Sequence, residues 1–375
     1  MGFNDQPLWS RYREHFPVTR RLVYLNHAGV APLVREAAEA MRQWATDAVE
    51  FGALHYDAWM AACDALRASA AKLIGCVPAE IAIVKNTSEG ISAVAGGINW
   101  RPGDRVIGFR EEFPANYFPW KRLEKHGVRL ELLSINDPLE KIDAACRGAR
   151  LLAVSFVQYL SWRRMDLEAI GEICCRHGCI FFVDAIQGLG AFPVDVAKAS
   201  IGTLAADGHK WLLGPEGCGI LYINKDLFDS VEPLEWGWTN FANYQDYANR
   251  EASYRADAGR YECGTLNTAG CVGLRAALDF LLSVGVERIA EAVQALGDRL
   301  AAGAAAKGYE ILGERTPATG AGIVSVRKPQ LDSRLIVRRL REAAVIAAPR
   351  QGWVRFSPHF YISPDEIDRA IDLLP

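Results

Sequence analysis

The chain has 375 residues, of which half are hydrophobic and 23% are charged, and its formal net charge is -3. This length suffices for two domains with a sizeable core. The slightly acidic balance argues against nucleic acid as a partner, because nucleic-acid-binding domains carry a strongly basic face. We expect no membrane-spanning helix, since no apolar run reaches about 18 residues. The first 21 residues mix charged and aromatic side chains and lack the apolar segment of a secretory signal.

The nine cysteines form no recognisable disulfide framework. Without a secretion signal, we expect reduced thiols and a cytoplasmic location. Cys174, Cys175 and Cys179 cluster near His177, which invites a zinc interpretation. The first two cysteines, however, fall on a helical pattern, and the paired Cys-x-x-Cys spacing of structural zinc sites is absent. We therefore expect no metal.

Short apolar runs alternate with amphipathic stretches from residue 81 onward, which is typical of a mostly parallel sheet with crossover helices. Strands are predicted at 81–85, 105–109, 130–133, 151–156, 179–183, 202–206 and 219–223. Helices are predicted at 86–98, 117–126 and 167–177. The sequence therefore predicts an α/β fold whose large domain contains a sheet of seven strands.

A smaller α/β layer is predicted after this sheet. Two helices, 270–284 and 286–307, are separated by Gly285. Strands follow at 323–327 and 353–357, with helices at 333–343 and 364–374. We expect three parts: an N-terminal segment, 1–20, which packs on the small domain, a large domain, 21–270, and a small C-terminal domain, 271–375.

Polar residues follow two of the predicted strands. Asp184 ends one strand, with Gln187 three residues later, and Gly208-His209-Lys210 follows the next strand. Ligands bind at the carboxyl ends of strands in open α/β sheets. A desolvated lysine can form a Schiff base with an aldehyde, and a carboxylate can keep a pyridine nitrogen protonated. This set predicts pyridoxal 5'-phosphate (PLP) as cofactor, although each residue alone also fits a structural role.

Other candidates have two interpretations each. Thr87 and Ser88 open a helix after a strand and could hold a phosphate, or Asn86 could simply cap that helix. Phe113 could stack on a flat ring or belong to the core. Arg355 could bind a carboxylate through both guanidinium nitrogens or form a surface ion pair.

Together, these residues resemble the class V aminotransferase group of fold-type I PLP enzymes, which includes cysteine desulfurases, kynureninases and isopenicillin N epimerases. The resemblance extends from Tyr24 to Tyr361. Its most specific part is the ordered set of Asp184-x-x-Gln187, Gly208-His209-Lys210 and Arg355-x-Ser357-x-x-x-Tyr361.

The resemblance implies a role for each residue. Lys210 would bind the cofactor covalently and then move the Cα proton, while Asp184 would pair with the pyridine nitrogen and Gln187 with the phenolate oxygen. The cofactor phosphate would be held by Thr87, Ser88 and His209, and Phe113 would stack on the ring. Arg355 would bind the substrate carboxylate in a pocket lined by Asn26, His27 and Ala28. Thr265 would reach the phosphate of a neighbouring subunit, which implies a homodimer with sites at the interface.

One departure from the resemblance concerns the reaction. Cysteine desulfurases carry a nucleophilic cysteine shortly before the arginine strand, and residues 342–352 contain none. We therefore expect a lyase, by C–S or other β-elimination, or an aminotransferase acting on a small α-amino acid, without a protein persulfide. An epimerase or racemase stays open as an alternative. The polar segment 239–255 also differs from larger members and could shape specificity.

Two other classes compete with this interpretation. A nucleotide-dependent oxidoreductase would need a glycine-rich turn after its first strand, and the sequence lacks one. A non-catalytic interaction protein could have kept the fold, since fold alone does not establish function. The presence of Lys210, Asp184 and Arg355 argues against that second alternative.

Overall fold

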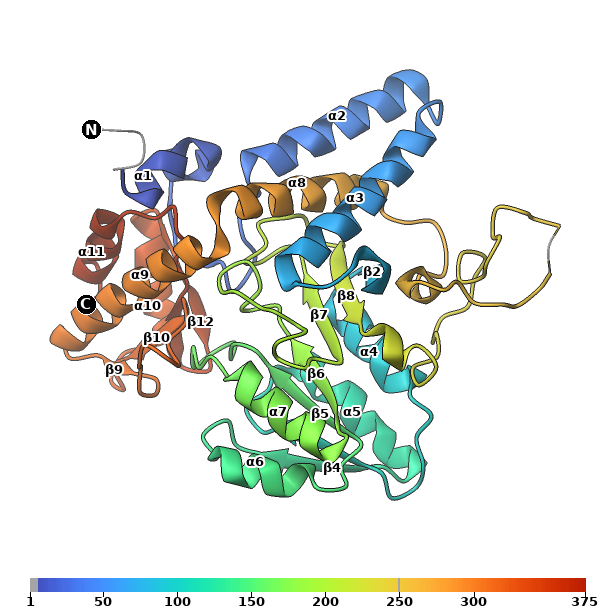
Figure 1. The fold of residues 1–375 in the computed structure, drawn as a ribbon. Coiled ribbons are helices and arrows are strands. Elements are labelled where there is room, and N and C mark those ends of the chain that lie inside the picture. Colours follow the sequence, from blue (N-terminus) through green and yellow to red (C-terminus); the bar gives the residue numbers. More distant parts are fainter. Residues whose placement is uncertain (1–5, 249) are drawn as a thin grey trace.

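A seven-stranded sheet forms the centre of the larger part of the molecule (Figure 1). The computed structural model describes residues 6–248 and 250–375. The strand order is β2-β8-β7-β6-β5-β3-β4. The strands are β2 (Ile81–Val84), β3 (Arg105–Phe109), β4 (Arg129–Leu133), β5 (Leu151–Ser155), β6 (Ile180–Asp184), β7 (Thr203–Asp207) and β8 (Gly219–Ile223). β8 pairs antiparallel with both β2 and β7, and all the other pairings are parallel. This confirms the predicted mostly parallel sheet.

Both faces of this sheet are covered, which explains why its central strands are continuously apolar. Along β6, Phe181 and Val183 join one hydrophobic core, and Phe182 between them joins the other. This alternation follows from the two-residue period of a strand. One core contains side chains of α4 (Thr87–Gly97) and α5 (Phe118–Arg122). The other contains side chains of α3 (Tyr56–Ile74), α6 (Leu139–Cys146), α7 (Leu167–His177) and α8 (Thr268–Val284).

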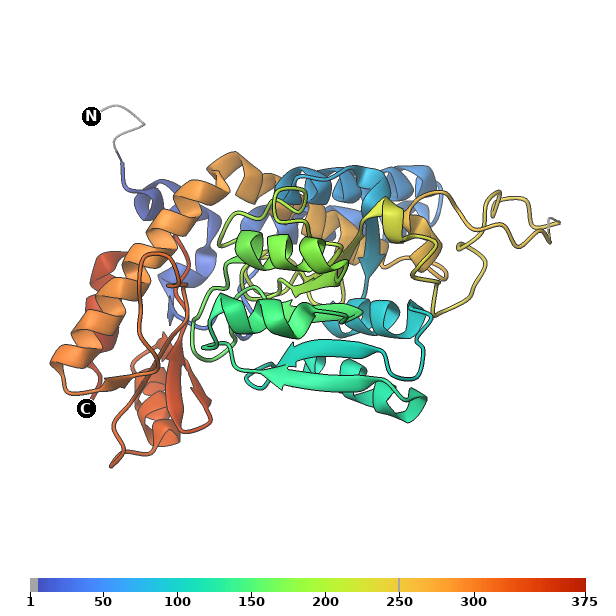
Figure 2. The same cartoon turned by 60° about the horizontal axis from the view of Figure 1, so that its bottom comes forward.

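The smaller part contains a four-stranded antiparallel sheet in the order β12-β13-β10-β9. Its strands are β9 (Glu310–Ile311), β10 (Val324–Arg327), β12 (Ala348–Arg350) and β13 (Trp353–Phe356). Its helices are α9 (Val286–Ala306), α10 (Ser333–Glu342) and α11 (Pro364–Asp372). In both views this part lies to one side of the large sheet, together with the C-terminus and the first helix of the described chain (Figures 1 and 2). The predicted strands β10 and β13 are present, whereas β9 and β12 are too short to leave a periodic signal.

Two long helices were not predicted. α2 (Arg35–Phe51) and α3 pack against α8 on one side of the sheet (Figure 1). In α2 only Ala37 is fully buried. The sequence of α2 is amphipathic, and the helix packs on α8, which supplies most of the stability of a helix in a folded protein. The predicted helix at 117–126 is instead α5 followed by a 3-10 turn, Leu123–His126.

Gly285 separates α8 from α9 at a bend of 83°. Its φ of 93° lies in the region that favours glycine. Because α8 packs on α2 and α3 while α9 packs on α11 and β10, we propose Gly285, rather than residue 270, as the division between the domains. Within the described ranges, no single helix is long and apolar enough to cross a membrane; α8 and α9 pass that test only as a bent pair.

The N-terminal segment contacts the C-terminal segment. Phe16 is fully buried, and its ring stacks on Tyr361 with centroids 3.6 Å apart and planes 10° apart. Arg13 donates to both carboxylate oxygens of Glu366 at 2.8 and 3.0 Å. Such stacking and bidentate pairing fix both the distance and the orientation of the partners. The segment after α1 (Leu8–Tyr12), which contains Arg13 and Phe16, therefore anchors the chain that leads into the short strand β1 (Val23–Tyr24).

Replacing Phe16 with alanine is expected to destabilise the fold by about 3–5 kcal/mol, because it removes a buried ring and leaves a cavity against Tyr361. The thermal unfolding midpoint of Phe16→Ala should fall clearly below that of the unmodified protein. Val49→Ala serves as control, since Val49 is 85% exposed and its truncation should leave the midpoint nearly unchanged. Equal midpoints for the two variants would contradict the anchoring role of the N-terminal segment.

Candidate functional site

The site forms where β6 and β7 end side by side. Asp184 is the last residue of β6 and pairs in register with Ala205 of β7. Lys210 follows β7 in a loop whose backbone is held by hydrogen bonds. Gly208 N donates to Cys218 O at 2.9 Å, and Gly214 N donates to Gly208 O at 2.9 Å. The side chain of Lys210 therefore starts from a fixed backbone at the carboxyl edge of the sheet, where open α/β folds bind ligands.

Burial sets the protonation of both groups. Burial raises the pKa of Asp184 to about 6, and the hydrogen bond from Ile186 N and the nearby Lys210 partly offset this shift. Burial lowers the pKa of Lys210 to about 8, with Asp184 acting in the opposite direction and Arg355 in the same direction. About a tenth of Lys210 at pH 7, and about half at pH 8, is therefore the free amine, which is the nucleophilic and basic form.

Gln187, three residues after Asp184, links its own segment to two others through hydrogen bonds. Its Nε2 donates to Ala28 O at 3.0 Å, and its Oε1 accepts from Trp211 Nε1 at 3.0 Å. A side-chain amide carries two N–H donors, so one donor of Gln187 remains for a further acceptor. Trp211 was not singled out from the sequence, and its apolar context there gave no hint of this hydrogen bond.

The turn after β2 forms the helix cap that one of its two predicted interpretations expects, while phosphate binding there stays a prediction. Asn86 caps α4 through a hydrogen bond from Glu89 N at 2.9 Å. Thr87 Oγ1 accepts from Asp207 N at 3.0 Å, which ties the start of α4 to the end of β7, while Ser88 is exposed. His209 Nδ1 lies 3.0 Å from Asp207 Oδ2 but is not aligned for a hydrogen bond. Within the part of the chain that the structure describes, His209 Nδ1 is a buried polar atom without a partner.

Arg355 lies on β13 and reaches the same region. It is 2% exposed, and its Nη1 donates to Tyr159 O at 2.8 Å. Burial lowers its pKa to about 10, and Arg350 contributes in the same direction. Among the described residues Arg355 Nε has no hydrogen-bond partner. A buried guanidinium with unused donors is suited to binding a carboxylate.

Two aromatic rings border Lys210. Lys210 Nζ lies 5.8 Å from the centroid of the Phe113 ring, and the Phe113 ring meets the Tyr159 ring edge-on at 5.3 Å. Phe113 is 46% exposed, so it is not a core residue. Tyr159 was missed in the sequence because its role depends on its carbonyl oxygen and on a contact with Gln351, whose Nε2 donates to Tyr159 Oη at 2.7 Å.

The segment Asn26-His27-Ala28 joins the two domains. His27 Nδ1 lies 2.8 Å from Ser357 O, and His27 Nε2 lies 2.7 Å from Tyr361 Oη. Ala28 N donates to Ser357 Oγ at 2.9 Å, and Asn26 forms a parallel bridge with Ser357. Burial lowers the pKa of His27 to about 4. Both ring nitrogens of His27 have hydrogen-bond partners within the protein. His27 therefore holds the two domains together at Ser357 and Tyr361 and has no ring nitrogen left for a substrate.

Glu112 is a buried carboxyl that the sequence analysis did not single out. Ser155 donates to it from both its backbone N, at 2.7 Å, and its Oγ. Burial raises the pKa of Glu112 to about 8, with Asp184 acting in the same direction. Its position next to Phe113, just after β3, is the signal that could have found it. A neutral Glu112 near neutral pH adds no second negative charge beside Asp184.

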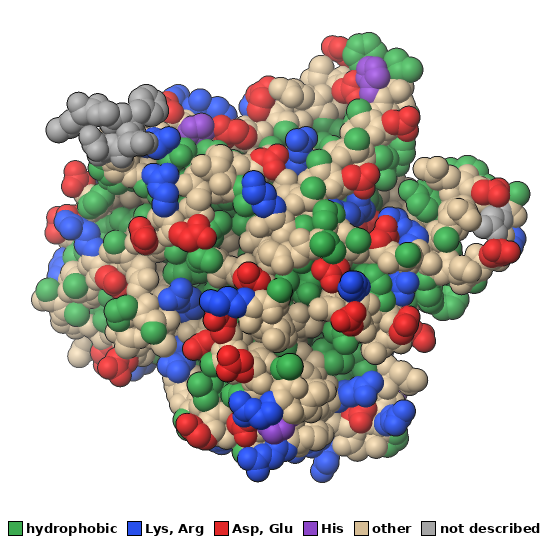
Figure 3. Space-filling model, in the orientation of Figure 1, with side chains coloured by type: hydrophobic (Ala, Val, Ile, Leu, Met, Phe, Trp, Pro, Cys, Tyr) green, Lys and Arg blue, Asp and Glu red, His purple; other side chains and the backbone are tan. Residues whose placement is uncertain are grey.

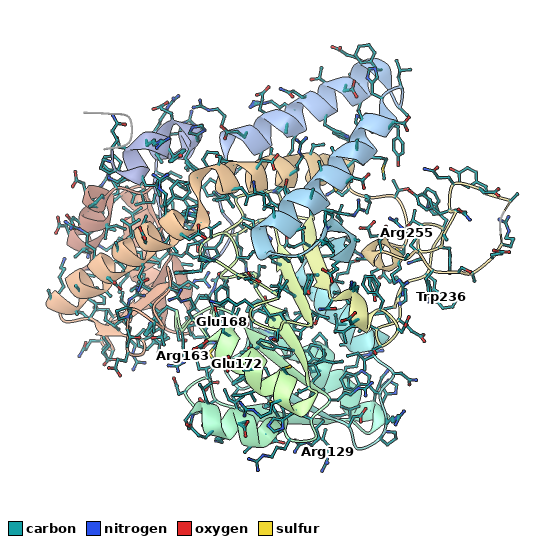
Figure 4. All side chains as sticks on the ribbon, viewed as in Figure 1. Arg129, Arg163, Glu168, Glu172, Trp236 and Arg255 are labelled. Atoms are coloured by element: carbon teal, nitrogen blue, oxygen red, sulfur yellow. The ribbon has the colours of Figure 1, made fainter. Side chains whose placement is uncertain are left out.

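Thr265 lies apart from these residues. It is exposed and lines a cavity of about 520 Å³, whose other walls include Tyr56, Arg67, Trp238, Tyr244 and Arg255. Glu262, three residues earlier, is held by a bidentate bond from Arg67 at 2.6 and 2.8 Å. Figure 4 shows Arg255 and Trp236 on the segment that extends away from the large sheet. The structure therefore does not bring Thr265 to Lys210 within one chain.

Comparisons with known proteins agree with this geometry. The family model described as Aminotransferase class-V matches residues 23–368. A probable cysteine desulfurase of Methanothermobacter thermautotrophicus is 30% identical over 382 residues, covering 95% of this chain and 94% of the relative. The apo structure of a cysteine desulfurase from Thermococcus onnurineus NA1 superposes with a TM-score of 0.91 at 27% identity, covering 97% of this chain and 96% of that one.

A further solved structure bears on the fold. It is a lysine mutant of C-DES with glycine covalently linked to its PLP cofactor, and it superposes with a TM-score of 0.89 at 23% identity, covering 96% of this chain and 98% of that one. The predicted fold-type I architecture is confirmed by these matches. Spanning nearly the whole chain, the family match establishes that the protein belongs to the class-V aminotransferases, a family of PLP-dependent enzymes.

Proposed function

We propose that the protein is a PLP-dependent lyase acting on a small α-amino acid that carries sulfur on its β-carbon. The observation that carries the proposal is the partly buried Lys210 at the end of the sheet, whose pKa is lowered to about 8 and whose charge interacts with those of Asp184 and Arg355. The preference for sulfur is supported by the relative named probable cysteine desulfurase, which is 30% identical to this chain.

The residues present fit the cofactor. Thr87 is the first residue of α4, where a phosphate is favoured by the helix dipole, and His209 Nδ1, which has no hydrogen-bond partner among the described residues, follows Asp207, whose N donates to Thr87 Oγ1. Asp184, only 2% exposed, offers a carboxylate to a ring nitrogen, and Gln187 offers its second amide hydrogen. The exposed ring of Phe113 provides a stacking surface above Lys210.

The chain's own groups then divide the chemistry among them. Bound PLP supplies an aldehyde for the substrate amine and a ring that withdraws electrons from Cα. Arg355 binds the substrate carboxylate through donors that are unused within the described chain. Lys210 Nζ, as a free amine, accepts the Cα proton. Asp184 holds the opposing charge that favours the withdrawal of electrons, and the buried surroundings strengthen this effect.

The sulfur group is proposed to leave without being captured by the protein. Residues 342–352 contain no cysteine. Cys263 lies near the proposed interface, but its Sγ contacts Glu235 Oε2 at 3.4 Å, and burial raises its pKa above the ordinary value. A thiol with a raised pKa is a poor nucleophile near neutral pH.

A homodimer and a cytoplasmic location complete the proposal. Thr265 is exposed on a cavity lined by Tyr56, Trp238, Tyr244 and Tyr247, which is the kind of aromatic surface found at interfaces. In a dimer this surface would supply Thr265 to the partner's phosphate. All nine cysteines are free, which fits a reducing compartment.

The reaction is tested by product analysis. The loaded enzyme is mixed with a panel of amino acids that includes cysteine, cystine, alanine and serine. The proposal expects pyruvate together with a sulfur product from the sulfur-bearing substrates. Transfer of the amino group to a keto acid would instead establish the aminotransferase alternative, and inversion at Cα without bond cleavage would establish an epimerase.

The lowered pKa of Lys210 predicts how the cofactor-free protein captures added PLP. Only the free amine reacts, and its fraction rises with pH through the pKa of about 8. The rate of covalent capture, followed by visible absorption, should therefore level off above about pH 9. Lys210→Arg should show no capture. A rate that keeps rising toward the ordinary lysine pKa of 10.5 would contradict the buried environment of Lys210.

Arg355→Ala is expected to raise KM by about 10- to 100-fold, because charge-assisted hydrogen bonds contribute about 1.5–3 kcal/mol each. Arg355→Lys should recover only part of this loss, since lysine lacks the planar fork. Arg338→Ala is the matched control, because Arg338 is an exposed residue of α10. If KM is the same for the Arg355 and Arg338 variants, the carboxylate is bound elsewhere.

A further inference from the structure

Three buried thiols gather outside the site described above. The Sγ atoms of Cys146, Cys174 and Cys179 all lie within 4.8 Å of one another. Their side chains are buried, with exposed fractions of 0%, 1% and 7%. The sequence placed Cys174 and Cys179 near each other but gave no reason to add Cys146, which comes from a different helix. The fold therefore completes a group that the sequence showed only in part.

The positions of the three sulfurs follow from the ends of secondary structure. Cys146 is the last residue of α6, and Cys174 lies in the last turn of α7. Gly178 ends α7 in the left-handed conformation with φ 63°, and Cys179 N then donates to Cys174 O at 2.9 Å. This turn directs the chain into β6, and α6 packs against α7. The sulfurs are thus held by a rigid backbone rather than by a loop.

The cluster lies at the amino end of the strand β6, whereas Asp184 and Lys210 lie at the carboxyl ends of β6 and β7. Cys179 directly precedes β6, whereas Asp184 is the last residue of that strand. A five-residue strand spans about 17 Å. Figure 4 marks Glu168 and Glu172 on α7, the helix that supplies Cys174. No residue assigned to the reaction belongs to this cluster, so its role is separate from catalysis.

The spacing suits a thiolate-bound metal ion. With metal–sulfur bonds of about 2.3 Å, three sulfurs around one ion lie about 4 Å apart, which is inside the observed separation limit. The ends of α6 and α7 direct carbonyl groups of negative partial charge to this region, which favours a cation.

The number of ligands indicates which ion. His177 is the nearest candidate for a fourth ligand, but its Nε2 lies 3.0 Å from Asp143 Oδ1, and Asp143 also pairs with Arg147 and Arg176. Within the ranges 6–248 and 250–375, the group that could hold an ion consists of the three cysteines only. Structural zinc almost always takes four ligands, whereas soft thiolates also select copper(I).

We propose that Cys146, Cys174 and Cys179 form a three-sulfur site for copper(I), which ties α6 and α7 to the start of β6. Each thiol that binds releases its proton to water as its sulfur–copper bond forms. The copper enters and remains as copper(I), so no electron is transferred. Arg105, whose Nη2 donates to the backbone oxygens of Ala145 and Arg147 on either side of Cys146, offsets part of the negative charge of the thiolates.

The test measures copper(I) affinity of the holoenzyme. Reduced protein is titrated anaerobically against the chelator bathocuproine disulfonate, and thiol content is first verified with a thiol reagent. The proposal expects one tightly bound copper per chain and three sulfur neighbours by X-ray absorption. Cys146→Ser should weaken binding by at least about 100-fold, while Cys175→Ser should leave it unchanged, because Cys175 is exposed and outside the group.

The experiment includes a replacement variant and a second control variant. If Cys146→Ser does not fold, as judged by circular dichroism and the cofactor spectrum, Cys179→Ser replaces it with the same expected loss. Cys63→Ser tests the other buried thiols, Cys63, Cys218 and Cys271, which interact with one another. Unchanged copper binding after loss of Cys146 or Cys179, a loss confined to Cys63→Ser, or tighter binding of zinc than of copper(I) would each overturn the proposal.

Discussion

The structure depends on the burial of opposite charges where β6 and β7 end. Asp184 and Lys210 are placed there by two parallel strands, and the low-polarity surroundings shift both of their pKa values toward neutrality. Burying a charge costs free energy unless it is paired. The covered faces of the sheet impose this cost, and the hydrogen-bonded backbone after β7 holds Lys210 in place. The result is a lysine that is partly unprotonated near neutral pH.

The second requirement is that a group on the small domain faces this pair. Arg355 lies on β13, and its position is fixed from two sides. Tyr159 O accepts from its guanidinium, and the neighbouring Ser357 is held by His27 and Ala28, which lie in the turn after the N-terminal strand β1. Phe16 and Arg13 in turn anchor that strand to Tyr361 and Glu366. Residues more than 300 positions apart in the chain therefore cooperate to place one carboxylate-binding side chain. Figure 3 shows acidic and basic side chains interspersed over one face of the molecule, in contrast to the paired charges inside.

The sequence predicted the parts of the structure that depend on local pattern. Strands such as β3 and β8, and the helix α7, begin and end where they were expected, because apolar runs and a helical pattern mark them. The helices α2 and α3 were missed because their stability comes from packing on α8. Among the site residues, Asp184 and Lys210 follow strands and were recognisable, whereas Tyr159, Trp211 and Glu112 act through contacts that only the fold creates. The same holds for Cys146, whose thiol neighbours are distant in the chain.

The most direct measurement of the central claim is to identify the lysine that binds the cofactor. The loaded protein is reduced with borohydride, digested, and its peptides are analysed by mass spectrometry. The account predicts that the phosphopyridoxyl mass is found on the peptide that contains Lys210 and on no other lysine. A label on a different lysine, or no covalent label in a protein that binds the cofactor, would contradict it.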